Sequence, residues 1–190
     1  MVNGEVSNFN LPNSITLLRI FLIPVFIWLF SEPTPDRALW SMVVFAGAAM
    51  TDFLDGYLAR RHGQITNLGK LLDPVADKLL VAAGLILLVQ AQRVSVWLAI
   101  VMIARELVVT GARAVAAREG LVVPADQLGK FKVVAQILGI ICLLALGVWG
   151  RWDFELWVAG TMLLYVALLF SLWSGWGYMA NIFKKIGPQW

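Results

Sequence analysis

The chain has 190 residues, of which 60% are hydrophobic and 14% are charged, and its formal net charge is +3. Soluble domains contain about 25% charged residues, so this composition excludes most soluble proteins and is typical of an integral membrane protein. The alternative is an unusually apolar soluble helical bundle, but several apolar runs approach the ~20 residues that cross a bilayer. The nine tryptophans also suit a membrane protein, because indole rings gather at membrane–water interfaces.

Six apolar segments predict an all-α membrane protein with six transmembrane helices in a single domain over residues 1–190. In chain order the segments cover roughly residues 13–31, 37–60, 69–91, 94–117, 126–149 and 154–180, with short polar connections between them. The first ten residues, MVNGEVSNFN, lack the basic start and apolar run of a cleavable signal peptide. The first segment is therefore expected to stay in the mature protein.

The basic residues predict how the six helices are oriented. With six spans both termini lie on one side, and the connections on the opposite side contain one basic residue each, namely Arg37, Arg93 and Arg151. The side of the termini contains a larger group: Arg60, Arg61, Lys70, Arg118, Lys130, Lys132, Lys184 and Lys185. Because basic residues favour the cytoplasmic side, we expect a multi-pass protein of the cytoplasmic (inner) membrane with both termini in the cytoplasm.

Four aspartates interrupt the second and third apolar segments near their cytoplasmic ends: Asp52, Asp55, Asp73 and Asp77. Helical spacing places the first two on one face together with Gly56, Ala59 and Arg60. The last two repeat at every fourth residue after Gly69 and also form one face. The connection RHGQITNL is short enough to make the two helices antiparallel neighbours, so the four carboxylates can converge on one cavity.

Four converging carboxylates cannot all stay ionised without a counter-charge. Carboxylate oxygens are the ligands of hard cations such as Mg²⁺, Mn²⁺ or Ca²⁺, and two divalent cations would neutralise four aspartates and hold a diphosphate substrate. The alternative is a set of ion pairs with Arg60, Arg61, Lys70 and Lys78. Ionisable residues within a membrane are functional by default, so the sequence predicts a two-metal site for phosphoryl-type transfer at the cytoplasmic end of the bundle.

The string D-x2-D-G-x2-A-R-x8-G-x3-D-x3-D from Asp52 to Asp77 resembles the signature of the CDP-alcohol phosphotransferases. Every fixed position of that signature is filled, and the length and six-span layout of the chain also agree with the family. The resemblance implies metal-dependent transfer of a phosphatidyl group from a CDP-linked lipid to an alcohol, with release of CMP. It also implies a homodimer.

The resemblance implies roles for individual residues. Asp52, Asp55 and Asp73 would bind metal, and Asp77 would share the second metal and act as the general base. The residues expected to bind CDP-diacylglycerol are Asn13, Thr16, Arg19, Gly56, Ala59, Arg60 and Thr66, the first three lying in LPNSITLLR.

Basic residues in the second half of the chain predict a phosphorylated acceptor. Arg105 and Arg113 are eight residues apart in the fourth span, close to two helical turns, so they share a face. Together with Lys130 they would bind a phosphate. Glu106, adjacent in sequence, is expected to point away from that face. Anchoring at the cytoplasmic surface is an alternative that explains Lys130 and Lys132, but Arg105 only poorly.

Within the family, the RE pair followed by LGKxK is most similar to the phosphatidylglycerophosphate synthase branch, which uses sn-glycerol 3-phosphate as acceptor. One departure is Val133, where relatives often have threonine. A transferase that uses inositol phosphate is the alternative within the family. A small cation transporter is the alternative from another class, although no internal repeat is present.

Overall fold

The computed structural model describes the backbone of residues 11–62, 67–118 and 127–186, and the side chains of residues 14–51, 75–117 and 131–180. The described backbone forms six helices and no strand, which confirms the predicted all-helical architecture. The helices are α1 (Leu11–Phe30), α2 (Pro35–His62), α3 (Asn67–Gln90), α4 (Val96–Arg118), α5 (Gln127–Leu144) and α6 (Asp153–Ile186).

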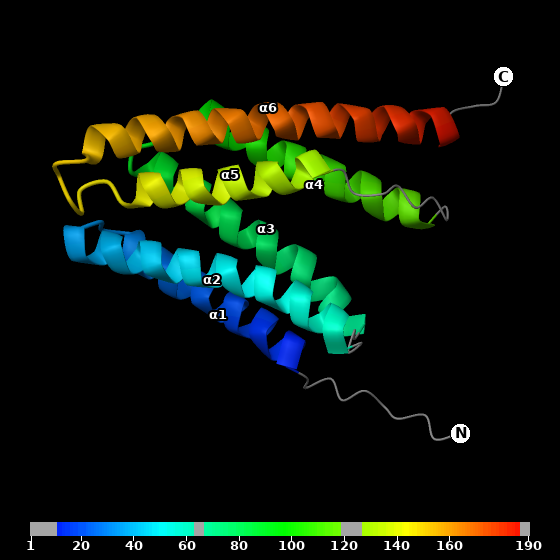
Figure 1. Cartoon of the computed structure of the whole chain (residues 1–190), viewed down its shortest axis with the longest axis horizontal. Coiled ribbons are helices and arrows are strands. Elements are labelled where there is room, and N and C mark those ends of the chain that lie inside the picture. The colour runs from blue at the N-terminus through cyan, green and yellow to red at the C-terminus, as the bar shows by residue number, and fades with distance from the viewer. Residues whose placement is uncertain (1–10, 63–66, 119–126, 187–190) are drawn as a thin grey trace.

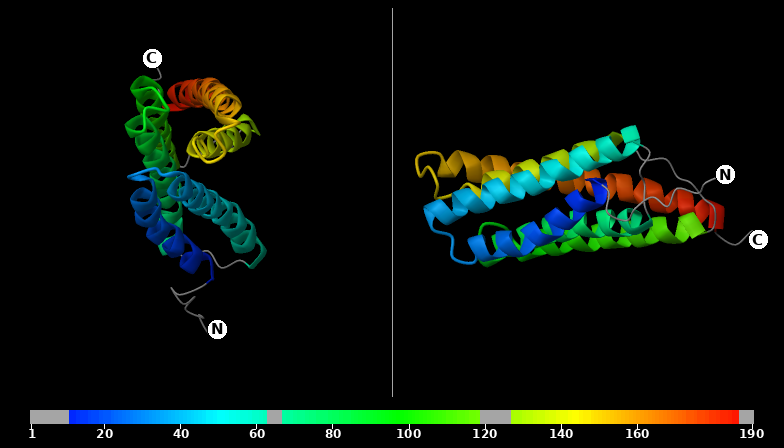
Figure 2. Two further views of the ribbon diagram at one scale, coloured as in Figure 1. Left: turned by 90° about the vertical axis from the view of Figure 1, so that its left-hand side faces the viewer. Right: turned by 90° about the horizontal axis from the view of Figure 1, so that it is seen from below.

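The helices run side by side along the long axis of the molecule (Figure 1). α1 packs against α2, α5 packs against α6, and α3 and α4 join these two pairs along one flank (Figure 2). α1 begins and α6 ends at the same end of the bundle, where α2 ends and α3 begins (Figure 1). The alternating direction of the helices therefore places the aspartate motif at the end of the bundle where α1 begins and α6 ends.

The fifth helix ends at Leu144 rather than at residue 149, so the sequence-based boundary was wrong there. Arg93, in the connection between α3 and α4, donates hydrogen bonds from Nη1 to the carbonyls of Leu143 (2.8 Å) and Leu144 (3.2 Å). These two carbonyls belong to the last turn of α5, which lacks intrahelical donors. Burial lowers the pKa of the Arg93 guanidinium, an effect that the Asp153 carboxylate opposes. A distant arginine thus caps the helix.

The contact between α5 and α6 depends on two glycines. A Cβ atom on Gly160 would lie 2.7 Å from Cγ of Leu143 and 3.0 Å from the carbonyl oxygen of Gly139. Such separations leave no room for a side chain. The two helices consequently approach backbone to backbone, as small residues permit in membrane bundles.

The bundle exposes large apolar side chains and buries several polar ones. Exposed residues occur on all six helices and include Phe21, Trp40, Leu79, Trp97, Phe131 and Trp173. The buried polar set consists of Thr16, Arg19, Ser41, Lys132, Gln136 and Ser171. Among the described residues, one helix, Asp153–Ala180, is by itself long and apolar enough to cross a membrane. Large exposed apolar surfaces of this kind mark contact with a membrane or another protein.

Candidate active site

The backbone brings the two halves of the aspartate motif together. Asp52 and Asp55 lie in the second half of α2, Asp73 and Asp77 lie in the first half of α3, and the two helices pack against each other. Asp77 is the motif aspartate whose side chain is described. Other predicted site residues have side chains that lie outside the described residues: Asn13, Asp52, Asp55, Gly56, Ala59, Arg60, Thr66, Asp73 and Lys130.

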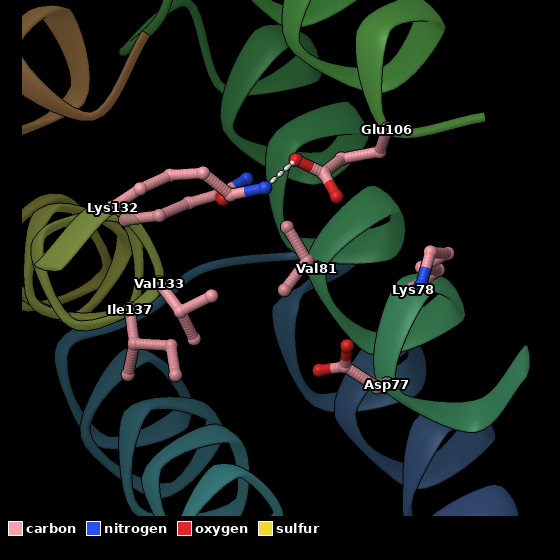
Figure 3. A pocket seen from close by; sticks show the side chains of 8 residues that line it. Asp77, Lys78, Val81, Glu106, Lys132, Val133 and Ile137 are labelled. Carbon is pink, nitrogen blue, oxygen red and sulfur yellow. Dashed lines mark hydrogen bonds and ion pairs between the residues drawn. The ribbon is translucent and has the colours of Figure 1, made fainter. Parts of the chain in front are cut away.

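Asp77 lines a small cavity of about 30 Å³ between α3, α4 and α5. Its carboxylate points toward the space between α3 and α5 (Figure 3). The other residues around the cavity are Lys78, Val81, Glu106, Lys132, Val133, Gln136 and Ile137. A cavity of this volume has room for a water molecule. Two carboxylates, two lysines and one amide therefore line a space that a hydroxyl group can enter.

Lys132 and Glu106 form an ion pair across this cavity (Figure 3). Lys132 is only 7% exposed, so anchoring at the membrane surface does not explain it. Nη1 of Arg105 also donates to Oε1 of Glu106, at 2.9 Å. The expectation that Glu106 points away from Arg105 was therefore wrong. Their Cα–Cβ bonds diverge by about 100° on the helix, but both side chains are long enough to bend toward each other.

Arg105 and Arg113 share a face, as predicted, and that face packs on α6. Nε of Arg105 donates to the carbonyl of Ser171 at 2.7 Å, and the guanidinium of Arg113 lies 5.3 Å from the ring centre of Tyr178. Arg105 also lines a mostly apolar groove of about 770 Å³ between α4 and α6. Arg105 is thus connected to the Asp77 cavity through Glu106.

Thr16 and Arg19 are both buried on α1, where they face the rest of the bundle. Nε of Arg19 donates to the carbonyl of Ala48 on α2, at 3.3 Å. Ala48 lies one helical turn before Asp52. The contact therefore places a fully buried cation beside the beginning of the motif.

Comparison with known proteins identifies the family. The model of the family described as CDP-alcohol phosphatidyltransferase matches residues 9–173. The chain belongs to this family. Three relatives are each named CDP-diacylglycerol–glycerol-3-phosphate 3-phosphatidyltransferase. The protein of Bacillus subtilis is 44% identical, with 94% of this chain and 97% of the relative covered. The protein of Pseudomonas fluorescens is 44% identical, with 90% of this chain and 88% of the relative covered. The protein of Escherichia coli is 38% identical, with 90% of this chain and 94% of the relative covered.

Three residues line the cavity with Asp77 but were not among the site residues predicted for this CDP-alcohol phosphatidyltransferase: Glu106, Lys132 and Gln136. A signal for two of them was present in α5. Lys132 and Gln136 are one turn apart and buried, whereas Phe131, Val134 and Leu138 form an exposed apolar face. A helix whose polar residues face inward and whose apolar residues face outward is typical of a membrane bundle with an internal polar site. No comparable pattern indicated that Glu106 would pair with Lys132.

Proposed function

We propose that this protein transfers the phosphatidyl group of CDP-diacylglycerol to sn-glycerol 3-phosphate, giving phosphatidylglycerophosphate and CMP. The observation that supports this most is the cavity that Asp77 and the buried Lys132 both line. A base for the acceptor hydroxyl and a cation for an anionic substrate then lie together. Relatives that cover most of the chain at 38–44% identity are named for the same reaction.

In the proposed reaction Asp77 accepts the proton of an acceptor hydroxyl. The hydroxyl oxygen attacks the β-phosphorus of CDP-diacylglycerol, a new P–O bond forms, and the bond to CMP breaks. The electron pair of that bond leaves with CMP, and the proton remains on Asp77 until water removes it. A general base that is positioned in this way contributes about 10²–10⁴ to the rate.

The four motif aspartates, Asp52, Asp55, Asp73 and Asp77, would hold two divalent cations, Mg²⁺ or Mn²⁺. An all-carboxylate set of oxygen ligands, supplied by two helices that pack together, fits hard cations of this kind. When bound, such ions neutralise the diphosphate and stabilise the charge that develops on the leaving group. Asp52, Asp55 and Asp73 would hold such ions beside Asp77, so that the diphosphate would lie within reach of the base.

The nucleotide end of CDP-diacylglycerol would bind where α1 meets α2. The residues assigned to it are Asn13, Thr16, Arg19, Gly56, Ala59, Arg60 and Thr66. The small residues on α2 allow a ligand to approach the backbone. The buried Arg19, held against Ala48, supplies positive potential beside the motif.

The acceptor phosphate would bind to basic residues of α4 and α5. Arg105, Arg113 and Lys130 are assigned to it, and Lys132 joins them because its ammonium faces the cavity of Asp77. Glu106 contacts both Lys132 and Arg105 and keeps the two cations close together before the anion arrives. Charge-assisted bonds to phosphate are about twice as strong as neutral ones.

The exposed apolar side chains and the distribution of basic residues support six membrane spans in the cytoplasmic membrane. Both termini and the aspartate motif would face the cytoplasm. The protein would act as a homodimer.

An acceptor screen tests this function. Purified protein is given CDP-diacylglycerol, a divalent cation and one acceptor at a time: glycerol 3-phosphate, inositol, inositol phosphate, serine or phosphatidylglycerol. Release of CMP should be fastest with glycerol 3-phosphate. Preference for inositol phosphate would move the protein to another branch of the family, and no release of CMP with any acceptor would favour a transporter.

A further inference from the structure

Gln136 has a buried amide with an unused hydrogen-bond donor. The residue is 4% exposed, and Nε2 has no hydrogen-bond partner among the described residues. The side chain lines the same cavity as Asp77 and Lys132. A buried amide donor therefore lies in the wall of the space in which the acceptor would react.

An unused donor of this kind is costly. Leaving a buried polar group without a partner destabilises a folded protein, and the great majority of buried side-chain polar atoms in folded proteins have a partner. A leucine or methionine at position 136 would fill the space without this cost. The amide of Gln136 therefore points to a hydrogen-bond acceptor that arrives with the substrate.

The position of the amide identifies the chemistry of that partner. Lys132 precedes Gln136 by one helical turn, so the two side chains project from α5 on the same side, about 6 Å apart along the helix axis. A ligand that places an anion at Lys132 and a reacting hydroxyl at Asp77 occupies the cavity that Gln136 also lines. The cavity has room for a small polar group such as a hydroxyl.

We propose that Gln136 donates a hydrogen bond to the hydroxyl of glycerol 3-phosphate that does not react, and thereby selects a polyol phosphate over a simple alcohol phosphate. The proposal rests on the function proposed above. A site that hydrogen-bonds a substrate hydroxyl rejects the analogue that lacks it, because its buried polar group is then left unpaired.

A substrate–variant cycle tests the proposal. The two acceptors are glycerol 3-phosphate and 3-hydroxypropyl phosphate, which keeps the phosphate and a primary hydroxyl but lacks the middle hydroxyl. The variant is Gln136→Met, which keeps the length of the side chain and removes the amide. The matched control is Gln90→Met, at the exposed end of α3 on the opposite side of the bundle.

Wild-type protein should prefer glycerol 3-phosphate in kcat/KM by about 10- to 100-fold. Gln136→Met should lose most of this preference, because activity with glycerol 3-phosphate falls while activity with the analogue stays within about threefold. Gln90→Met should behave as wild type. Equal loss on both acceptors, or an unchanged preference in the variant, would overturn the proposal, as would a wild-type protein that does not discriminate.

Thermal unfolding gives a second readout. Because the donor has no partner among the described side chains, Gln136→Met should not lower the melting temperature, but it should reduce the stabilisation that glycerol 3-phosphate produces. A lower melting temperature with an unchanged response to glycerol 3-phosphate would mean a structural role. If Gln136→Met fails to fold, Gln136→Asn, which withdraws the amide by one methylene, takes its place in the cycle. Failure of the wild-type protein to use glycerol 3-phosphate would instead refute the proposed function.

Discussion

Lys132 on α5 forms an ion pair with Glu106 on α4 across the cavity that Asp77 lines. The side chains are 9% and 22% exposed, so water screens the pair only weakly. Glu106 also accepts a hydrogen bond from Arg105. One carboxylate therefore pairs with two cations in the interior of the bundle.

The first prediction concerns this carboxylate. Glu106→Gln leaves Lys132 and Arg105 without their common counter-charge, so the free energy of unfolding should fall by about 1–3 kcal/mol, somewhat less than for a fully buried pair. The matched control is Glu32→Gln, which breaks the ion pair with Arg37 at the other end of the bundle, where Glu32 is 82% exposed. That change should be nearly silent. Denaturant unfolding in detergent measures both, and equal losses would contradict the role of Glu106.

The second prediction separates the base from the ligands. Asp77→Asn keeps the shape of the side chain and an oxygen, but removes the proton acceptor. We expect kcat to fall by about 10²–10⁴, while CDP-diacylglycerol still binds. Steady-state kinetics and a direct binding assay check this. Lost binding with an unchanged rate at saturation would show that another group is the base.

The third prediction concerns the metal. Asp52→Ala, Asp55→Ala or Asp73→Ala should each nearly abolish activity without unfolding the bundle, and EDTA should do the same reversibly. The reason is that a diphosphate beside four carboxylates needs neutralising cations. Activity is measured before and after addition of Mg²⁺ or Mn²⁺. Full activity in EDTA would rule out the two-metal site.

The fourth prediction tests the acceptor phosphate. Arg105→Gln should raise the KM for glycerol 3-phosphate by about 10- to 150-fold, because a charge-assisted bond is lost, and should hardly change the KM for CDP-diacylglycerol. Arg105→Lys should restore only part of the affinity, since lysine lacks the guanidinium fork. Arg37→Gln is the control on the opposite side. If both KM values rise together, the contacts of Arg105 with Ser171 and Glu106 are purely structural.

The fifth prediction concerns the α5–α6 contact. Gly160→Ala should destabilise the bundle by about 1–3 kcal/mol, since the new methyl group would clash with Leu143 and the backbone of Gly139. Gly111→Ala, on a helix face with no atom near the new methyl group, should be neutral or slightly stabilising. Equal effects of the two substitutions would show that the close approach is not required.

The sequence predicted the six helices because each is an apolar run between short polar connections, and such runs depend only on local composition. It did not predict the end of α5, since the cap comes from Arg93, about fifty residues earlier in the chain. For the same reason it missed the ion pair of Lys132 with Glu106. A lysine near the cytoplasmic surface and a lysine turned into the bundle have the same local sequence, and only the packing of α4 against its neighbours distinguishes them.

The aspartate motif could be read from the sequence because its spacing determines which residues share a helix face. The spacing of Lys132 and Gln136 also places them on one face of α5, but it does not show that this face lies beside Asp77. Predictions from spacing therefore reached the motif on α2 and α3, whereas the contribution of α5 required the three-dimensional arrangement.

The most direct test follows both products of the proposed reaction. Purified protein receives CDP-diacylglycerol, Mg²⁺ and radiolabelled glycerol 3-phosphate, and the label in the lipid fraction is compared with the CMP released. The proposed function predicts equal amounts of labelled lipid and CMP in wild-type protein, and about 10²–10⁴ times slower formation of both products in the Asp77→Asn variant. Release of CMP without labelled lipid, or labelled lipid formed equally well by Asp77→Asn, would contradict it.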